Sequence, residues 1–294
     1  MVTIKSFSVG LGDMFYIRHG SQNFTIIDCY LSPSDKDRII GELKVAGSDK
    51  AISRFISSHP DEDHLSGLHW LDDALPIVNF YCVANQATKA IETDGFKRYK
   101  SLRDGDKAFH LYRDVQRRYM NLPGDYGSAG LEVLWPKVGN EHYKTELQRA
   151  AGGGSPNNIS TIVRYSLQGG ASALWMGDLE QPFMEKIQDE IVLPKTNILF
   201  MPHHGRKSGK LPQKWIDQID PDVIIKGEAH SKNSDYVSNP DRNKIHQNSA
   251  KDIVMELESK KVHFFVSEPT YCVDFLTNEG KSRSGYHYIG TLNL

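Results

Sequence analysis

The segment "ISSHPDEDHLSGL", residues 56–68, crowds four side chains that can bind a metal ion into a single bend. It overlaps the end of "AISRFISS", whose β-branched and aromatic residues are typical of a buried strand. His59 and Asp61 are two residues apart, and Asp63 and His64 are adjacent. Neutral imidazole and carboxylate groups are ligands for Zn²⁺ and Mn²⁺. We therefore predict a metal site at the end of this strand.

Two later strand patterns also end in side chains that can bind a metal. "ALWMGDLE" places Asp178 directly after an apolar strand, and "ILFMPHHG" places His203 and His204 after another. Two metal ions roughly 4 Å apart need more ligands than one bend can offer, and a carboxylate at Asp178 is suited to bridge them. The spacing does not distinguish the two histidines. We predict His203 as the ligand because it comes first after the strand, and His204 as a proton donor, a ligand-orienting residue or a structural one.

Short patterns of β-branched and aromatic residues recur along the chain, separated by turns and by helical patterns. Residues 246–260 are predicted to form a helix, and residues 262–266 and 270–276 to form the strands that follow it. Residues 139–158 are predicted to be a long polar connection with a flexible glycine run. Strands interleaved with helices in both halves predict an α/β (α+β) fold of two packed sheets with helices outside. No linker pattern divides the chain, so we predict one domain over residues 1–294.

The composition gives little support for binding through bulk charge or for a membrane-bound protein. The chain of 294 residues has a net charge of −2, which does not favour general binding to nucleic acids or membrane surfaces. Its three cysteines are odd in number and form no CxxC motif, which favours a reducing compartment over a disulfide framework. No segment has the pattern of a signal peptide or of a membrane-spanning helix. We expect a cytoplasmic protein without membrane insertion.

Residues 86–128 are the least regular part of the chain and are predicted to form a polar, basic insertion. Within them, residues 97–118 contain eight basic and three acidic side chains, interleaved with aromatic rings. Basic side chains pair with phosphates and aromatic rings stack on bases, so the segment is a candidate nucleic-acid surface. A solvated helical face explains the same pattern slightly better.

Four motifs in this order resemble the metallo-β-lactamase superfamily: "SHPDEDHLSGL", "NNISTIVRY", "MGDLE" and "MPHHG". The chain is most similar to the soluble hydrolase domain of ComEC-type DNA-uptake proteins, and the N-terminal "VGLGDMFYIRHGSQNFTIIDCY" is similar to the opening strands of that group. The resemblance covers most of residues 3–240. It implies an αββα sandwich of two mixed sheets with a metal site at one edge.

Carried over position by position, the resemblance implies two metal-binding sets. Asp63, His64 and His203 would hold one ion, and His59 and Asp61 would hold the other. Asp178 would bridge the two ions, so that the metal residues are His59, Asp61, Asp63, His64, Asp178 and His203.

The chain departs from the superfamily pattern on the side of His59. Asp61 stands where a histidine is more common, and Asn157 and Asn158 stand where a further histidine is usual. Fewer nitrogen ligands and more oxygen ligands predict a weaker and harder second site. We therefore expect one or two divalent ions, Zn²⁺ or Mn²⁺. Further departures are Leu11, Cys29 and Asn239.

The predicted function is metal-dependent hydrolysis of a phosphodiester, in DNA or RNA, through a metal-activated water. Asp61, Asp63 and His204 are the predicted catalytic residues. His204, His230 and Tyr236 are candidates to protonate the leaving group. Hydrolysis of a small ester, lactone or β-lactam is a second hypothesis. A third is a non-catalytic or partner-activated effector module of a multi-protein system, which would need a protein partner.

Several polar residues near the motifs are candidates for contacting the substrate. Asn157, Asn158, Ser160 and Lys207 are predicted to meet its oxygens, although Asn158 and Ser160 are about as well suited to cap the loop before a strand. Asp13, in "GLGD", is either a turn residue or a partner that orients a ligand histidine.

Overall fold

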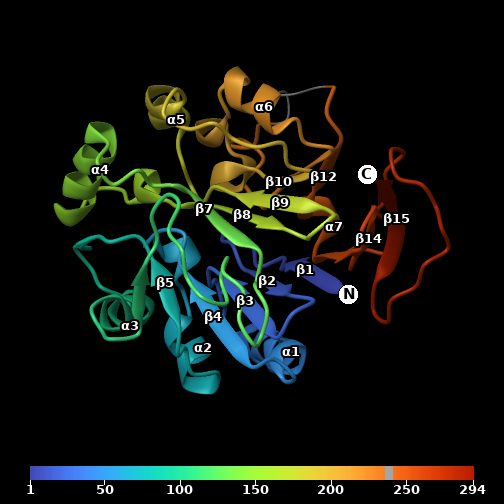
Figure 1. Ribbon diagram of the computed structural model, residues 1–294, viewed down its shortest axis with the longest axis horizontal. Coiled ribbons are helices and arrows are strands. Elements are labelled where there is room, and N and C mark those ends of the chain that lie inside the picture. Colours follow the sequence, from blue (N-terminus) through green and yellow to red (C-terminus); the bar gives the residue numbers. More distant parts are fainter. Residues whose placement is uncertain (236–240) are drawn as a thin grey trace.

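The computed structural model of the chain describes residues 1–235 and 241–294. In this part of the chain, two β-sheets pack face to face and helices cover their outer faces (Figure 1). Nine strands of the first sheet lie in the described residues, and they form both parallel and antiparallel pairs. In spatial order its strands are β15 (His287–Asn293), β14 (Lys261–Val266), β13 (Ile253–Leu257), β1 (Val2–Ser6), β2 (Phe15–Arg18), β3 (Asn23–Ile27), β4 (Ile52–Ile56), β5 (Phe80–Cys82) and β6 (Ala108–His110).

The second sheet is also mixed, and six of its strands lie in the described residues. In spatial order these strands are β12 (Lys244–His246), β11 (Val223–Lys226), β10 (Ile198–Phe200), β9 (Ser172–Trp175), β8 (Ile162–Ser166) and β7 (Leu131–Trp135). Strand β8 pairs antiparallel with both β7 and β9, whereas β9, β10, β11 and β12 run parallel to one another. The predicted sandwich of two mixed sheets is confirmed.

The helices divide between the two outer faces. Helices α1 (Lys36–Gly47), α2 (Leu68–Ala74) and α3 (Asp94–Arg103) bury their apolar residues in one cluster with the outer face of the nine-stranded sheet. Helices α4 (Glu141–Ala151), α5 (Gln181–Ile187) and α6 (Gln213–Ile219) contribute to the cluster that contains the second sheet, and the short α7 (Gln247–Ala250) follows β12. Figure 1 shows the two helical groups on opposite sides of the paired sheets.

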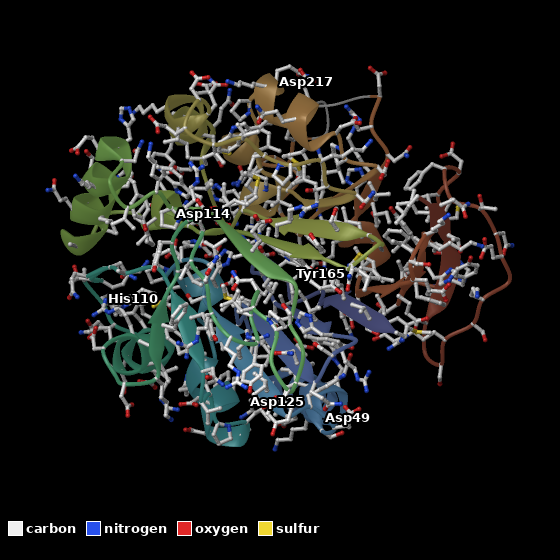
Figure 2. All side chains as sticks on the ribbon, viewed as in Figure 1. Asp49, His110, Asp114, Asp125, Tyr165 and Asp217 are labelled. Carbon is white, nitrogen blue, oxygen red and sulfur yellow. The ribbon has the colours of Figure 1, made fainter. Side chains whose placement is uncertain are left out.

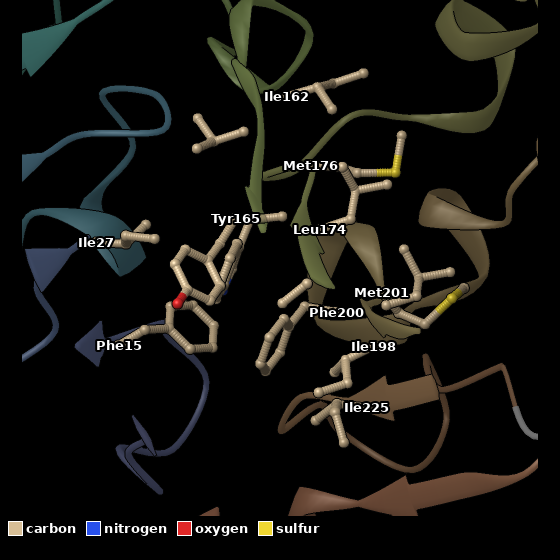
Figure 3. Close-up of a cluster of buried hydrophobic side chains, with 14 of the residues drawn as sticks. Phe15, Ile27, Ile162, Tyr165, Leu174, Met176, Ile198, Phe200, Met201 and Ile225 are labelled. Atoms are coloured by element: carbon tan, nitrogen blue, oxygen red, sulfur yellow. The ribbon is translucent and has the colours of Figure 1, made fainter. Parts of the chain in front are cut away.

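Alternation along the strands explains the two clusters. In β2, Phe15 and Ile17 lie in the cluster between the sheets, whereas Tyr16 lies in the cluster under the helices. This is the period of two that a strand imposes on its side chains. Phe15 contacts Phe200 of the second sheet at 5.0 Å between ring centroids, and Figure 3 shows these rings among the apolar side chains of the interior. Charged groups such as Asp49 lie at the periphery instead (Figure 2).

Two predicted elements near the C-terminal end are wrong. The helix predicted over residues 246–260 is only the short α7, and β13 follows it, because Ile253 and Val254 suit a strand that pairs between β1 and β14. An apolar run of this length is compatible with either element until its neighbours are known. The strand predicted at 262–266 is confirmed as β14, but 270–276 is a loop, and β15 pairs with β14 in its place.

The segment predicted as a polar connection, residues 139–158, is also different. It contains α4, whose N-cap Asn140 accepts a hydrogen bond from the backbone N–H of Tyr143 at 3.0 Å. Tyr143 and Ala150 are buried and anchor this otherwise polar helix. Leu147 also packs against the core, so the apolar stripe is narrow, with Tyr143, Leu147 and Ala150 among otherwise mostly polar residues.

The polar and basic segment around residues 86–128 contains α3 and β6 and lies against the nine-stranded sheet. Most of its basic side chains have partners within the chain. Examples are Arg98 with Asp72 at 2.6 Å and Arg117 over the ring of Phe109 at 4.1 Å. These contacts favour the interpretation as a solvated face. Within the described ranges, no helix combines the length and hydrophobicity that crossing a bilayer requires.

Candidate metal centre

The ends of three strands meet at one edge of the sandwich. The bend after β4 carries His64, the loop after β9 carries Asp178, and the loop after β10 carries His204. Together with Asp13, from the loop before β2, each of these residues offers a ligand atom, and the four atoms lie within 4.8 Å of one another. Side chains separated by up to about two hundred positions are thus gathered by the topology of the sheets.

His64 is oriented by a carboxylate from a neighbouring strand end. Its Nδ1 donates a hydrogen bond to Asp28 Oδ2 at 2.8 Å, and Asp28 also accepts hydrogen bonds from the backbone N–H and the hydroxyl of Ser58, at 2.7 and 2.6 Å. The other ring nitrogen, Nε2, therefore faces Asp178 Oδ1 at 3.1 Å. A histidine held at one nitrogen by a carboxylate presents a fixed and basic lone pair at the other nitrogen.

His204 is held in the same way. Its Nδ1 donates to Asp13 Oδ1 at 3.0 Å, and its Nε2 lies 3.4 Å from Asp63 Oδ2 and 3.5 Å from Asp178 Oδ2. Its backbone is in the left-handed region, with φ of 56°, as is that of His203, with φ of 53°. Consecutive left-handed residues other than glycine are uncommon, and such backbone is often found at functional sites. Asp13 was predicted to be either a turn residue or a partner that orients a histidine. Its contact with His204 Nδ1 favours the second alternative.

Four buried polar atoms around this point have no hydrogen-bond partner among the described residues. They are His59 Nε2, His64 Nε2, His204 Nε2 and Asp178 Oδ1. Buried polar atoms are normally paired, because an unpaired one costs about 1–3 kcal/mol. Imidazole nitrogens and carboxylate oxygens that face a common point without aligned hydrogen bonds are a suitable donor set for a divalent ion. The residues present therefore fit a metal site.

The buried histidines and aspartates of the centre shift one another's pKa values. Burial acts to lower the pKa of His64, but Asp178 and Asp28 outweigh it and raise the pKa well above its ordinary value. Burial likewise opposes the ionised form of Asp178, but His204 and His64 hold its pKa well below the usual range. Burial, and secondarily the charge of His64, lowers the pKa of His59 to about 4. His59 is therefore neutral near pH 7 and keeps a lone pair on Nε2.

His203 lies at the rim and has partners for both ring nitrogens. Nδ1 is 2.9 Å from the hydroxyl of Ser208, and Nε2 is 3.1 Å from Arg206 Nη1. The same Nε2 is 3.6 Å from Asp178 Oδ2, so His203 is near the centre but already engaged. His204 belongs to the group of converging ligand atoms, whereas His203, the ligand predicted from sequence order, does not.

The two aspartates of the first motif differ in their surroundings. Asp63 is near both buried imidazoles, with Oδ1 3.8 Å from His64 Nε2. Burial alone would raise its pKa, but His204, whose Nε2 lies 3.4 Å from Oδ2, and His64 lower it below the usual range. Asp61 has other partners: its Oδ1 accepts the backbone N–H of Glu62 at 2.9 Å and pairs with the ammonium of Lys89.

The predicted substrate contacts are mostly engaged within the chain. The amides of Asn157 and Asn158 contact Glu180, at 3.5 and 3.3 Å. Ser160 Oγ accepts the backbone N–H of Asp178 at 3.0 Å and so positions that carboxylate. Lys207 Nζ donates to the carbonyl of Lys232 at 3.2 Å.

Two candidates for protonating the leaving group remain without a described contact to the centre. His230 is exposed and contributes its backbone carbonyl to a turn, accepting the N–H of Asn233 at 2.8 Å. Tyr236 lies outside the described residues, as does the departure at Asn239.

Sequence reasoning missed three residues of the site. Asp28 follows the strand pattern "FTIID", so the rule that found Asp178 applies to it too. Lys89 and Arg206 carry no local pattern that indicates proximity to the centre. Only the fold brings the ammonium of Lys89 to Asp61 and the guanidinium of Arg206 to within 3.9 Å of Asp63.

No family model and no curated protein matches the chain. Among solved structures, it is similar to CmlA, a diiron β-hydroxylase from Streptomyces venezuelae, at 11% identity and a TM-score of 0.39, over 76% of this chain and 44% of that one. It is also similar to BLEG-1, a B3 metallo-β-lactamase, at 16% identity and a TM-score of 0.36, over 65% of this chain and 87% of that one.

A third solved structure is described as a Zn-dependent hydrolase of the metallo-β-lactamase superfamily from Thermotoga maritima. It has 12% identity and a TM-score of 0.34, over 83% of this chain and 97% of that one. The chain spans less than half the length of CmlA. TM-scores this low do not indicate a function for the chain. A functional proposal therefore depends on the residues of its own site.

Proposed function

We propose that this chain is a metal-dependent hydrolase whose substrate is a phosphodiester, with DNA and RNA as the first candidates. The observation that carries the proposal is the convergence of unpaired, buried imidazole nitrogens and carboxylate oxygen at the ends of three strands. No pairing within the described residues accounts for these atoms, whereas one divalent ion would account for them together.

The proposed ligands are His64, His204 and Asp178, with Asp63 beside them. A divalent ion bound there would act as a Lewis acid and make hydroxide available near neutral pH. Asp28 and Asp13 keep the two imidazoles in the tautomer that leaves Nε2 free. Asp63 is ionised near neutral pH and can accept a hydrogen bond from the attacking molecule. In this proposal His204 is a ligand, and the proton donor to the leaving group is not assigned.

Arg206 supports a phosphate rather than a carbonyl substrate. Its guanidinium lies at the rim, with Nη1 3.1 Å from His203 and Nη2 3.9 Å from Asp63, and its Nε is buried without a described partner. A guanidinium presents several donors in a plane that matches the oxygens of a phosphate. A charge fixed beside the reacting group also stabilises the negative charge that develops in the transition state.

The test compares variants for hydrolysis of single-stranded DNA, RNA and a small chromogenic phosphodiester, each with Mn²⁺, Zn²⁺ or Mg²⁺. Asp178→Asn and His64→Ala are expected to reduce the rate by at least 100-fold. Lys214→Met, which removes a surface pair with Asp189, is the control and is expected to keep the parent rate.

Parent-like rates in both site variants would overturn the assignment of the centre. Turnover of carboxylic esters, lactones or β-lactams in place of phosphodiesters would replace the substrate class but keep the hydrolase. Bound metal with no turnover on any of these substrates would favour an effector module that acts with a protein partner.

A further inference from the structure

An ammonium group pairs with a carboxylate of the first motif. Lys89 lies between β5 and α3, and its Nζ pairs with Asp61 Oδ1. The side chains are 19% and 30% exposed, so the pair is partly withdrawn from solvent. We infer that Lys89 takes the place of a second metal ion, and that the centre therefore binds one divalent cation per chain. The inference rests on the proposed metal-dependent function and specifies its stoichiometry.

The donors on the two sides of the centre are unequal. On one side, His64, Asp178, His204 and Asp13 form a group of converging ligand atoms. On the other side, His59 Nε2 is the buried nitrogen without a partner in the described chain. A single imidazole is too few to hold an ion there, since protein metal sites need three or four ligands.

Two of the groups that would complete a second site, Asp61 and Asn158, are engaged elsewhere. Asp61 Oδ1 accepts a backbone N–H and the ammonium of Lys89 at the same time. Asn158 Oδ1, the amide atom that could bind a metal ion, already accepts the backbone N–H of Glu180 at 3.1 Å. Asn157 Oδ1 is buried without a partner in the described residues, so it and His59 Nε2 are two donors, fewer than the three or four that a metal site needs.

Charge acts in the same direction as the missing ligands. Like charges repel more strongly in a partly buried site than in water, because the effective dielectric constant is lower. A dication beside His59 would face the ammonium of Lys89 across Asp61. The ammonium neutralises the carboxylate of Asp61, which would otherwise attract a second ion. The centre is therefore expected to bind one ion.

Removing the ammonium should reveal the second site. Metal-free protein is titrated with Mn²⁺ by isothermal calorimetry, and bound metal after dialysis is measured by elemental analysis. The parent is expected to bind one equivalent, and Lys89→Met is expected to bind two, because Asp61 is released to join His59. Lys89→Arg keeps the positive charge and is expected to bind one.

Two further variants separate this effect from general loss of a lysine. Lys100 lies on α3 and forms a comparable, partly exposed pair with Glu92. Lys100→Met breaks this pair and is expected to bind one equivalent. Lys89→Met combined with Asp61→Asn is expected to return to one, because the second carboxylate is gone. Thermal denaturation of each variant confirms that it is folded.

Two equivalents in the parent would overturn the inference while leaving the metal-dependent function intact. One equivalent in a folded Lys89→Met, up to millimolar Mn²⁺, would also overturn it. No binding of Mn²⁺, Zn²⁺ or Mg²⁺ to the parent would remove the proposed function itself, and this inference with it. The parent alone gives a decisive count even if Lys89→Met does not fold.

Discussion

Asp28 has a left-handed backbone, with φ of 57°, which turns its carboxylate from the end of β3 toward Ser58 and His64. Aspartate and asparagine adopt this conformation more readily than most residues. The carboxylate is buried and accepts three hydrogen bonds, from the backbone N–H and hydroxyl of Ser58 and from the ring of His64. It therefore fixes the direction in which His64 presents Nε2.

Replacing Asp28 with asparagine should weaken metal binding without unfolding the chain. Asparagine keeps the backbone conformation and most of the volume but supplies less negative charge to His64. Loss of such a ligand-orienting carboxylate typically lowers metal affinity by about 10–100-fold. Calorimetric titration of Asp28→Asn with Mn²⁺ measures the change, with Asp72→Asn, which alters a pair on the outer face, as the control. Equal affinity in parent and Asp28→Asn would contradict an orienting role.

Paired variants of the two adjacent histidines test which one is the ligand. His204→Ala is expected to lower Mn²⁺ affinity by at least 100-fold, because it removes a buried ligand atom held by Asp13. His203→Ala is expected to lower it by less than about 10-fold, because both of its nitrogens already have partners. The same titration decides the matter. A larger loss in His203→Ala would restore the assignment made from sequence order.

The sequence predicts the residue types of the centre better than their roles. His64 and Asp178 are found because each follows a strand, and the described structure gathers them. The choice between His203 and His204 depends on two left-handed residues and on Asp13, which is about two hundred positions away. Contacts of that kind depend on the packing of both sheets, which no local pattern encodes.

At the scale of elements, the turn after β9 shows how closely the loops of the centre are packed. Gly177 has a φ of 51°, and a Cβ built on it would lie 2.6 Å from Ser160 Oγ and 3.2 Å from Ser58 Cβ. Its carbonyl accepts the backbone N–H of His203 at 2.9 Å. The turn thus connects the loops after β4, β9 and β10 through a position where only glycine fits.

Gly177→Ala is expected to destabilise the chain by about 2 kcal/mol or more, from the strained backbone and the contact with Ser160. Gly41→Ala is the matched control, since Gly41 is exposed within α1 and has no atom near the added methyl. It is expected to stabilise the chain by about 0.5–1 kcal/mol. Urea denaturation measures both. Equal stability of the two variants would contradict this description of the turn.

The sequence predicts an element correctly where its own residue pattern indicates a buried strand. The prediction fails where strands far along the chain determine whether a segment forms a helix or a strand. The strand pattern before His59 corresponds to β4, whereas β13 was predicted as helix. The residues of β13 become a strand because β1 and β14 flank them on both sides. Tertiary pairing of this kind overrides local preference.

At the scale of the whole molecule, His19 joins the two sheets. It follows β2, its Nε2 is 2.9 Å from Thr25 Oγ1, and its ring meets that of Tyr165 in the second sheet at 5.4 Å between centroids. Burial, followed by the charges of Arg54 and Lys50, lowers its pKa well below the ordinary value of 6.5. His19 is therefore neutral in the folded chain.

This burial predicts a loss of stability in mild acid. In the unfolded chain His19 takes up a proton below about pH 6.5, whereas the folded chain excludes it. The contribution of His19 is thus complete above that pH and falls by about 1.4 kcal/mol per pH unit below it, until the folded pKa is reached. Urea denaturation of the parent and His19→Gln from about pH 7.5 to about pH 5.5 should show the difference between them narrowing. A constant difference would contradict the prediction.

The position of β1 inside the nine-stranded sheet has a consequence for synthesis of the chain. β1 pairs on one side with β2 and on the other with β13, Val2 opposite Leu257. A ribosome must therefore translate as far as Leu257 before that second partner exists. Until then β1 has an open edge on the side that β13 later covers, and an open strand edge can pair with other molecules.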